Sequence, residues 1–328
     1  MPREAKPFSM GLASRLLGAG ELMRILLTGG RGMVGRNILE SAQTNEHEIV
    51  APTRDELDLR DAEAVRSFFA NVRPDAVVHA AGVVGGIAAN IADPTRFLRD
   101  NLQIGVNVIE SARSAGVPDL LNLGSSCMYP RFASNPLVED SILTGELEPT
   151  NEGYAIAKIA TERLCRYISS QYPEHRYRTL IPCNLYGRHD SFAEGRAHMV
   201  PAAIVKVHRA KEEGADEVEI WGTGTARREF MYAGDLADFV FFALDRMEAL
   251  PQVINVGVGT DRSINEYYQA VADVVGYRGG YRHDLSKPVG MGQKLVDISL
   301  ATALGWRART SLQEGLSKTY EFYLETDA

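Results

Sequence analysis

The sequence predicts an α/β fold in which a doubly wound parallel sheet is joined to a smaller α/β lobe. Short apolar runs typical of buried strands alternate with helical stretches from residue 24 to residue 182, and a glycine-rich turn follows the first run. Beyond residue 188 this alternation ends, and only residues 226–257 return to it. We therefore expect residues 23–188 and 226–257 to form a cofactor-binding domain and residues 189–225 and 258–328 to form a substrate-binding lobe.

The composition is ordinary for a soluble globular protein, since 45% of the 328 residues are hydrophobic and 24% are charged. The net charge of −8 disfavours nucleic acid or an anionic membrane as a partner. No apolar run reaches the roughly 18 residues of a membrane span. The three cysteines lack metal-binding spacing and suit a reducing cytoplasm, so we expect no metal site. We interpret residues 1–22 as an N-terminal tail outside the fold.

A buried strand at residues 24–28 and the turn after it predict a dinucleotide-binding site of the Rossmann type. The turn reads Thr28-Gly29-Gly30-Arg31-Gly32-Met33-Val34-Gly35, with Gly29, Gly32 and Gly35 at TGxxGxxG spacing. The first glycine permits the tight turn, the second lets backbone approach a pyrophosphate, and the third lets the helix pack on the strand. Because the turn stands between a strand and a helix, the motif is a specific one.

The residue that reads the adenosine ribose is expected after a second strand at residues 48–53. Arg54 stands at this place, and an arginine accommodates the 2′-phosphate of NADP, whereas an acidic residue would favour NAD. Arg31 in the glycine turn could assist it. Asp55 and Glu56 follow directly and leave open that Arg54 is only a surface charge.

The remaining elements of the sheet domain follow from the same alternation. We expect strands at residues 75–82, 120–123, 177–182 and 253–256 and helices at residues 61–71, 94–114 and 235–246. His79 is flanked by apolar residues and is interpreted as a packed strand residue. Ligands bind at the carboxyl ends of such strands, so the segment 124–129, Gly-Ser-Ser-Cys-Met-Tyr, should present hydroxyls and a thiol to the cofactor cleft.

A further helix is expected to begin after Pro149, with Thr150 or Asn151 as its cap. Tyr154 and Lys158 would share one face of it, about 6 Å apart along the axis. An ammonium group beside a phenol lowers the phenol pKa from about 10 because the positive charge favours phenolate. Such a pair can protonate the alkoxide formed when a ketone is reduced, although two ordinary residues on a solvated face have the same spacing.

Together with Ser125, these two residues form the Ser–Tyr–Lys triad of the short-chain dehydrogenases, and the chain resembles the extended branch of that family over essentially its whole length past Met23. Six motifs narrow the resemblance to the GDP-L-fucose synthase family. They are Gly-Arg-Gly-Met-Val-Gly (30–35), Val-Val-Gly-Gly-Ile-Ala-Ala-Asn (83–90), Gly-Ser-Ser-Cys-Met-Tyr-Pro (124–130), Glu-Pro-Thr-Asn-Glu-Gly-Tyr-Ala-Ile-Ala-Lys (148–158), Asn-Leu-Tyr-Gly (184–187) and Trp-Gly-Thr-Gly-Thr-Ala-Arg-Arg-Glu-Phe (221–230). The resemblance implies a cytoplasmic homodimer that uses NADPH to convert GDP-4-keto-6-deoxy-D-mannose to GDP-L-fucose.

The resemblance also implies a role for each catalytic residue. Cys127 and His198 would act as acid and base in inverting C3 and C5, whose hydrogens the C4 ketone acidifies. Tyr154 would then protonate the C4 oxygen, Ser125 would hold that oxygen, and Lys158 would bind the nicotinamide ribose. Taken alone, Cys127 suits a small core position equally well, and His198 suits a hydrogen-bonded polar residue.

The ligand-binding positions come from the same resemblance. The cofactor-binding set is Gly29, Gly30, Arg31, Gly32, Met33, Val34, Gly35, Arg54, Leu59, Ala80, Ala81, Leu123, Gly124, Lys158, Pro182, Asn184, Leu185 and His198. The substrate-binding set is Ser126, Asn184, Lys206, Trp221, Arg228 and Lys294. By themselves, Trp221 also suits a core position in the lobe and Arg228 suits a surface charge.

The chain departs from the family pattern at three positions on the substrate side. Lys206 stands where the family has an arginine, which keeps the charge but loses the planar fork that suits a diphosphate. The family loop Lys-Pro-Asp-Gly-Thr-Pro-Arg-Lys reads Lys-Pro-Val-Gly-Met-Gly-Gln-Lys over residues 287–294. An acidic substrate ligand has thus become Val289 and an arginine has become Gln293, so the sugar, or less readily the base, could differ.

Other activities fit parts of the pattern. The nearest is C4 reduction, with or without epimerisation, of a related 4-keto sugar such as a heptose or a dideoxy sugar. A nucleotide-sugar 4,6-dehydratase should have an acidic pair after Ser126, where Cys127 and Met128 stand, and a 4-epimerase should more often have an acidic residue in place of Arg54. A non-catalytic NADP-sensing protein need not keep the Ser–Tyr–Lys triad.

Overall fold

Six parallel strands form the central sheet, in the order β10-β5-β4-β3-β1-β2. They are β1 (Arg24–Thr28), β2 (Glu48–Val50), β3 (Ala76–His79), β4 (Asp119–Leu123), β5 (Arg176–Pro182) and β10 (Val253–Val256). The computed structural model describes residues 22–193, 197–287 and 290–327. The strand order turns back between β1 and β3, so the expected doubly wound parallel sheet is confirmed.

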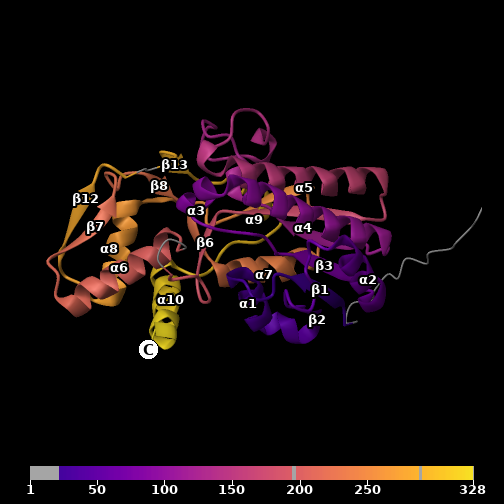
Figure 1. The fold of residues 1–328 in the computed structure, drawn as a ribbon, viewed down its shortest axis with the longest axis horizontal. Coiled ribbons are helices and arrows are strands. Elements are labelled where there is room, and N and C mark those ends of the chain that lie inside the picture. The colour runs from indigo at the N-terminus through magenta and orange to yellow at the C-terminus, as the bar shows by residue number, and fades with distance from the viewer. Residues whose placement is uncertain (1–21, 194–196, 288–289, 328) are drawn as a thin grey trace, which may run out of the picture.

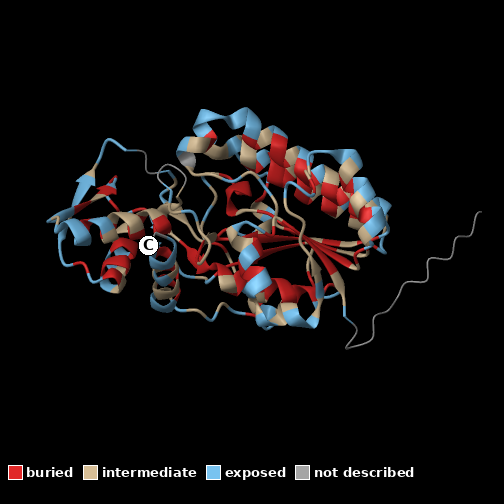
Figure 2. Ribbon diagram, turned by 60° about the horizontal axis from the view of Figure 1, so that its bottom comes forward, coloured by how far each residue is buried: buried red, intermediate tan, exposed pale blue. Residues whose placement is uncertain are grey.

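Helices cover both faces of this sheet (Figure 1). They are α1 (Met33–Glu40), α2 (Ala62–Val72), α4 (Pro94–Ser114), α5 (Glu152–Gln171) and α7 (Ala233–Leu244), with the short helices α3 (Ile87–Ala92) and α9 (Ser299–Ala303) at the ends of loops. Helices α2, α4 and α5 pack together on one face, and α1 and α7 pack on the other. The strands are accordingly buried between two helical layers (Figure 2).

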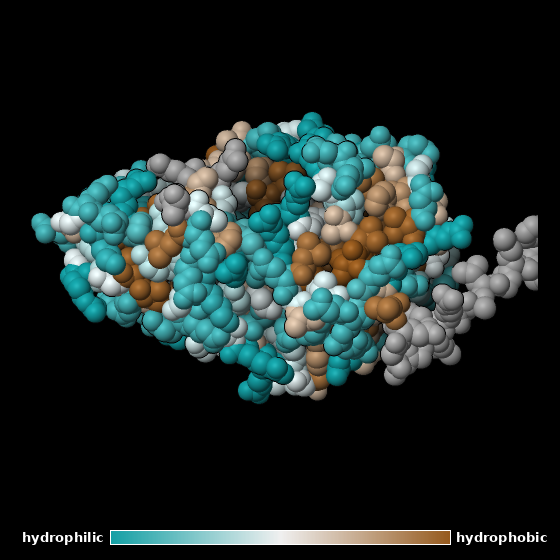
Figure 3. Space-filling model, turned by 90° about the horizontal axis from the view of Figure 1, so that it is seen from below, coloured by the Kyte–Doolittle hydropathy of each residue, from teal (hydrophilic) through white to brown (hydrophobic). Residues whose placement is uncertain are grey.

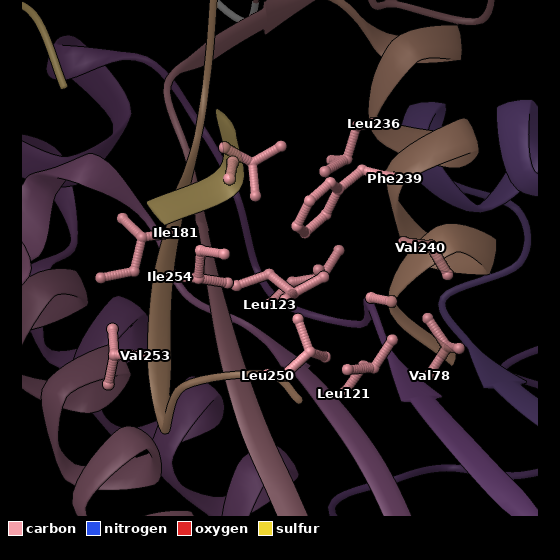
Figure 4. Packing of buried hydrophobic residues seen from close by; sticks show 14 of the residues in the cluster. Val78, Leu121, Leu123, Ile181, Leu236, Phe239, Val240, Leu250, Val253 and Ile254 are labelled. Atoms are coloured by element: carbon pink, nitrogen blue, oxygen red, sulfur yellow. The ribbon is translucent and has the colours of Figure 1, made fainter. Parts of the chain in front are cut away.

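Alternate residues of each strand face the two helical layers, as the two-residue period of a strand requires. Leu26, Val77 and Leu120 belong to the cluster that contains α2, α4 and α5. Their neighbours belong to the cluster that contains α7, where the strand residues Val78, Leu121, Leu123, Ile181 and Ile254 lie opposite Leu236, Phe239 and Val240 (Figure 4). Each such side chain contributes about 1.5–3 kcal/mol through burial.

The smaller lobe has its own sheets and its own core. Strand β7 (Glu217–Trp221) pairs with β12 (Gly280–Asp284), strand β8 (Arg227–Arg228) lies between β11 (Arg262–Ser263) and β13 (Gln293–Lys294), and β6 (Asn184–Tyr186) pairs with β9 (Phe230–Tyr232). Helices α6 (Met199–Glu213), α8 (Ile264–Val275) and α10 (Leu312–Asp327) enclose a cluster that includes Ile204, Val218, Tyr267 and Leu316. A capping box between Ser263 and Glu266 starts α8.

Helix α5 begins after Pro149, as expected, but the expected side-chain cap is absent. A short 3-10 turn at Pro149–Asn151 comes first, and the Glu148 carboxylate accepts the Thr150 N–H at its start. Asn151 holds the N-cap position of α5, but its side chain makes no capping hydrogen bond. The capping hydrogen bond is thus made one turn earlier, where the Glu148 carboxylate accepts the free Thr150 N–H of the 3-10 turn.

Strands β2 and β3 are also shorter than expected, ending at Val50 and His79 rather than at residues 53 and 82. After β2 the chain turns, and the Glu56 carboxylate accepts the Thr53 N–H at 2.7 Å. The expected tail lies outside the described residues apart from Leu22, and so does Val289.

No helix in the described part of the chain is long and apolar enough to cross a membrane. On the face seen from below, hydrophilic residues cover most of the surface, and apolar residues gather in separate patches near its middle (Figure 3).

Candidate functional site

The glycine turn between β1 and α1 has the shape of a pyrophosphate cradle. Gly29 has a φ of +77°, and a Cβ there would come within 2.7 Å of the Ala81 nitrogen. A Cβ on Gly35 would lie 2.2 Å from the Gly29 oxygen, so helix α1 could not keep its distance from the turn. Gly32 is the N-cap of α1, whose free N–H groups and positive dipole end therefore lie at the turn. This arrangement suits the pyrophosphate of a dinucleotide.

The expected cofactor-binding residues follow the carboxyl ends of the sheet strands. Gly29, Gly30, Arg31, Gly32, Met33, Val34 and Gly35 follow β1, Arg54 and Leu59 follow β2, Ala80 and Ala81 follow β3, Leu123 and Gly124 end β4, and Pro182, Asn184 and Leu185 lie at and beyond the end of β5. The sheet topology therefore brings these positions to one edge, where ligands of such sheets bind.

Arg54 and Arg31 are both exposed beside this edge. Glu56, which could have acted as an acidic ribose reader, is held back on its own turn by the Thr53 backbone and side chain, and these hydrogen bonds lower the pKa of its carboxyl. The Arg31 charge lowers that pKa further. The two arginines are thus the side chains of this turn that suit a phosphate.

His79 is a packed strand residue, as expected, and it also orders the loop after β3. Its Nδ1 lies 2.7 Å from the Thr28 hydroxyl, which accepts the Ala81 N–H at 3.4 Å. Burial, followed by the Lys158 charge, lowers the pKa of His79 to about 3, so the imidazole is neutral at pH 7. The pair holds the Ala81 backbone against the glycine turn.

Ser125, Tyr154 and Lys158 come together where β4 meets α5. Ser125 begins the short 3-10 helix at Ser126–Met128, which packs on α5, and its hydroxyl lies close enough to Tyr154 to lower the pKa of the phenol. The Lys158 Nζ lies 5.8 Å from the centre of the Tyr154 ring and donates to the Leu123 carbonyl at 2.7 Å. The triad expected from the spacing is therefore assembled in the fold.

The expectation that Lys158 lowers the pKa of Tyr154 is wrong for this structure. Burial raises the pKa of the Tyr154 phenol, the Cys127 thiolate charge raises it further, and only the Ser125 hydrogen bond lowers it. Burial also lowers the pKa of Lys158, to about 8. Desolvation disfavours both charged forms, and here it outweighs the pairing that the helical spacing suggests.

Cys127 lies next to Ser125, in the short helix that packs on α5. Its side chain is buried, and burial raises the pKa of the thiol, whereas the Lys294 charge and a hydrogen bond with Ser125 lower it. Lys294 comes from β13 of the smaller lobe, and burial lowers the pKa of its ammonium while the Cys127 thiolate opposes this. Cys127 is thus both a buried residue and a lining residue of the site.

His198 stands on a different element, as the N-cap of α6. Burial lowers the pKa of its imidazole, which favours the neutral form at pH 7. The chain before it passes Gly86, where a Cβ would lie 3.9 Å from the Ala197 oxygen. The described contacts link Cys127 to the triad and to Lys294, but they do not link it directly to His198.

The remaining substrate-side residues lie on several elements of the smaller lobe. Lys206 donates to the Glu219 carbonyl at 3.2 Å, and Asn184 donates to the Glu229 carbonyl at 2.7 Å. Trp221 is 49% exposed, which excludes a core position for it. Burial lowers the pKa of Arg228, whereas the Glu148 charge raises it, so Arg228 is more than a surface charge.

Gln293, one of the altered positions, and Ser126 are the remaining substrate-side positions with described surroundings. Gln293 donates to the Asp261 carboxylate at 2.6 Å, and Arg227 donates to the same carboxylate at 2.9 Å. Ser126 is buried in the short helix after β4, next to Cys127. The replacement of the family arginine by Gln293 thus adjoins an Arg–Asp pair at the edge of β13.

The sequence interpretation missed a residue that ties the smaller lobe together. Glu229 is fully buried, and its carboxylate accepts the Val258 and Gly259 N–H groups at 2.7 Å each and the Val296 N–H at 2.9 Å. It thereby fixes the segments beside Arg228 and Lys294. The available signal was an acidic residue followed by the apolar run Phe-Met-Tyr, which is unusual for a strand unless the charge is satisfied inside.

Asn101 on α4 is a second missed residue. Its Oδ1 accepts the Val83 N–H at 2.8 Å, and its Nδ2 donates to the Val83 carbonyl at 3.0 Å. A Cβ on Gly82 would lie 3.0 Å from Asn101 and 3.8 Å from the Lys158 Nζ. Asn101 therefore orders the loop that passes Lys158, a role for which helical spacing has no signal.

Known proteins resemble this chain over nearly its whole length. Residues 25–257 match the NAD dependent epimerase/dehydratase family. GDP-L-colitose synthase of Yersinia pseudotuberculosis is 50% identical over 302 residues, which are 92% of this chain and 98% of that protein. GDP-L-fucose synthase of Azorhizobium caulinodans is 51% identical over 305 residues, covering 93% of this chain and 97% of that protein. Among solved structures, a GDP-mannoheptose C4 reductase from Campylobacter jejuni with NADP bound has a TM-score of 0.84 and 34% identity, covering 92% of this chain and 98% of that one.

Proposed function

Because this chain belongs to the NAD dependent epimerase/dehydratase family, and within it to the group of GDP-L-fucose and GDP-L-colitose synthases, we propose that it is an NADPH-dependent epimerase/reductase that converts GDP-4-keto-6-deoxy-D-mannose to GDP-L-fucose. The observation that carries the proposal is the position of Cys127 in the short helix that follows Ser125 and packs on α5, the helix of Tyr154 and Lys158, where burial raises the pKa of the thiol and the charges of Lys294 and Lys158 lower it. A ketone reductase needs only the triad, whereas an epimerase also needs a second proton-transferring group.

We assign NADP(H) as the cofactor, which when bound supplies the hydride for C4. The glycine turn fits its pyrophosphate, because Gly29 and Gly35 let the turn, the loop after β3 and helix α1 approach closely, so that the free N–H groups of α1 lie at the turn. Arg54, with Arg31 beside it, suits the 2′-phosphate, while Glu56 is turned back on its own backbone. The remaining contacts would come from the cofactor-binding set that follows the strand ends, and Lys158 would hold the nicotinamide ribose.

In the reduction step, Tyr154 would give its phenolic proton to the C4 oxygen as that oxygen gains negative charge. The raised pKa keeps the proton on the phenol until charge develops next to it. Ser125, whose hydroxyl lies near the Tyr154 phenol, would hold the same oxygen. Lys158, with its Nζ fixed by the Leu123 carbonyl, supplies positive charge beneath the ring.

In the epimerisation step, His198 would act as base and Cys127 as acid. Burial lowers the pKa of the His198 imidazole and raises the pKa of the Cys127 thiol, so at pH 7 the first can accept a proton and the second still has one to give. The base removes hydrogen from C3 or C5 on one face, and the acid returns a proton on the other. Lys294 would stabilise the transient thiolate.

The proposal also assigns one ligand to each lobe. The sheet domain would hold the cofactor, and the smaller lobe would hold the GDP-sugar in the cleft between them. Their bounds differ from the expected ones, because β6, β8 and β9 form sheets of the smaller lobe, whereas Val296 and Trp306 pack in the core of the main sheet. We also propose a cytoplasmic homodimer. Val106 of α4 and Ile156 and Tyr167 of α5 are exposed on two adjacent helices, which suits pairing with the same helices of a second copy.

A second candidate function is C4 reduction of another GDP-linked 4-keto sugar, such as a heptose. The changes at Lys206 and Gln293 favour it, because both lie on the nucleotide-sugar side, and so does the likeness to a GDP-mannoheptose C4 reductase. The test incubates the purified protein with NADPH and each candidate 4-keto GDP-sugar and identifies the product by NMR. GDP-L-fucose from the deoxymannose substrate supports the first function, and turnover of the heptose alone supports the second.

A further inference from the structure

Two ammonium groups lie over one exposed indole on the smaller lobe. The Nζ atoms of Lys206 and Lys287 lie 5.4 Å and 5.6 Å from the centre of the Trp221 ring. Lys206 belongs to α6 and Lys287 to the turn after β12, so two separate segments converge on this side chain. Trp221 is 49% exposed at the end of β7, where its Nε1 donates to Glu219 at 3.2 Å.

The backbone holds Lys287 at a defined place relative to Trp221. Asp284 is paired with Trp221 in the β7–β12 ladder. The Asp284 carbonyl accepts the Lys287 N–H at 3.4 Å, and its carboxylate accepts the Ser286 N–H and hydroxyl at 3.0 Å and 2.7 Å. The turn that carries Lys287 is therefore ordered by the residue opposite the indole.

The two ammonium groups repel each other, and the surroundings only partly neutralise them. The Lys287 charge lowers the pKa of Lys206, after burial and against the Glu219 charge. The Glu219 carboxylate also accepts hydrogen bonds from Trp221 and from Arg282 at 2.7 Å, so it is shared among several donors. A local excess of positive charge in a chain of net charge −8 is stabilised when an anion binds.

We propose that Lys287 is a substrate-binding residue that, together with Lys206, binds the diphosphate of the nucleotide sugar beside Trp221. An ammonium is a point charge without the planar fork of arginine, so Lys206 by itself holds a diphosphate at one point. Lys287 adds the second point, and the indole keeps both groups near one another through cation–π attraction. The identity of the nucleoside, guanosine, rests on the proposed function. The binding of a diphosphate rests on the two lysines alone.

The test is calorimetric binding of GDP, UDP and guanosine to the full-length wild type and to Lys287→Ala, Lys287→Arg and Lys318→Ala. Lys318 is a matched control, because its Nζ also lies 5.6 Å from an aromatic ring, that of Tyr232, but is paired with Glu314 at 2.7 Å. We expect Lys287→Ala to weaken GDP binding about tenfold at low salt, Lys287→Arg to keep most of the affinity, and Lys318→Ala to bind GDP as the wild type does. Any affinity for guanosine should be the same in all four proteins.

An unchanged GDP affinity in Lys287→Ala would overturn the proposal. So would an equal loss for guanosine, which would place the effect in the local fold, or a wild type that binds neither diphosphate. Binding of UDP in place of GDP, with the same loss in Lys287→Ala, would support the diphosphate grip and refute the guanosine part of the proposed function. With the true substrate, Lys287→Ala should raise KM and leave kcat nearly unchanged.

Discussion

Alanine substitutions at two glycines of the same turn should separate its structural role from its ligand-binding role. A Cβ on Gly35 would lie 2.2 Å from the Gly29 oxygen and 2.6 Å from the Gly30 Cα, both backbone atoms that cannot rotate away. A Cβ on Gly32 would meet only the Gly29 oxygen, at the ordinary distance of 3.4 Å, and the Gly32 backbone at φ −77° suits an L-residue.

The magnitudes follow from these contacts. Gly35→Ala must move α1 away from the turn by about 1 Å, and overpacking of this kind costs about 1–3 kcal/mol. In a chain of 328 residues each 1 kcal/mol lowers Tm by about 1.5 °C, so we expect Gly35→Ala to melt about 1.5–4.5 °C below the wild type. Gly32→Ala should melt within about 1 °C of it but bind NADPH at least about tenfold more weakly, because its methyl group stands where the pyrophosphate approaches.

Differential scanning calorimetry and fluorescence titration with NADPH measure the two effects on the same samples. Gly292→Ala is a control for the glycine-to-alanine change, since a Cβ there meets nothing within 4 Å. A Gly35→Ala protein that melts with the wild type would refute the packing argument. Wild-type NADPH affinity in Gly32→Ala would refute the placement of the pyrophosphate at this turn.

Four further predictions concern the chemistry. Tyr154→Phe should lose ketone reduction by orders of magnitude yet still bind NADPH, and near-normal NADPH oxidation would contradict its role as proton donor. Arg54→Ala should raise KM for NADPH about tenfold and leave NADH nearly unchanged, because charge-assisted hydrogen bonds are worth about 1.5–3 kcal/mol; equal loss with both cofactors would mean a structural arginine. Cys127→Ser should slow deuterium exchange at C3 and C5 by about 10²–10⁴-fold in deuterated water while reduction continues. If the variant exchanged these hydrogens at the rate of the wild type, Cys127 would be excluded as the acid of the epimerisation. Burial lowers the pKa of His198, so that exchange should persist below pH 6.5 and fall only at the lower pKa; a fall centred at or above 6.5 would contradict His198 as a buried base.

The sequence by itself determined the parts of the protein that depend on local periodicity. The bounds of β1, α4 and β10 agree with the expected residues, because a continuous apolar run or a helical repeat is complete within each segment. The glycine spacing and the common face of Tyr154 and Lys158 are local in the same sense, since turn and helix geometry fix them without reference to the rest of the chain.

Only the tertiary structure decided the pKa values of these groups and the interactions between segments far apart in the chain. Whether the pKa of Tyr154 falls or rises depends on how far it is desolvated, which is a property of the packed site and not of its spacing from Lys158. The effect of the Lys294 charge on Cys127 and the convergence of Lys206 and Lys287 on Trp221 involve segments far apart in the chain. Such contacts arise when separate segments pack, and no pattern within a single segment of the sequence records them.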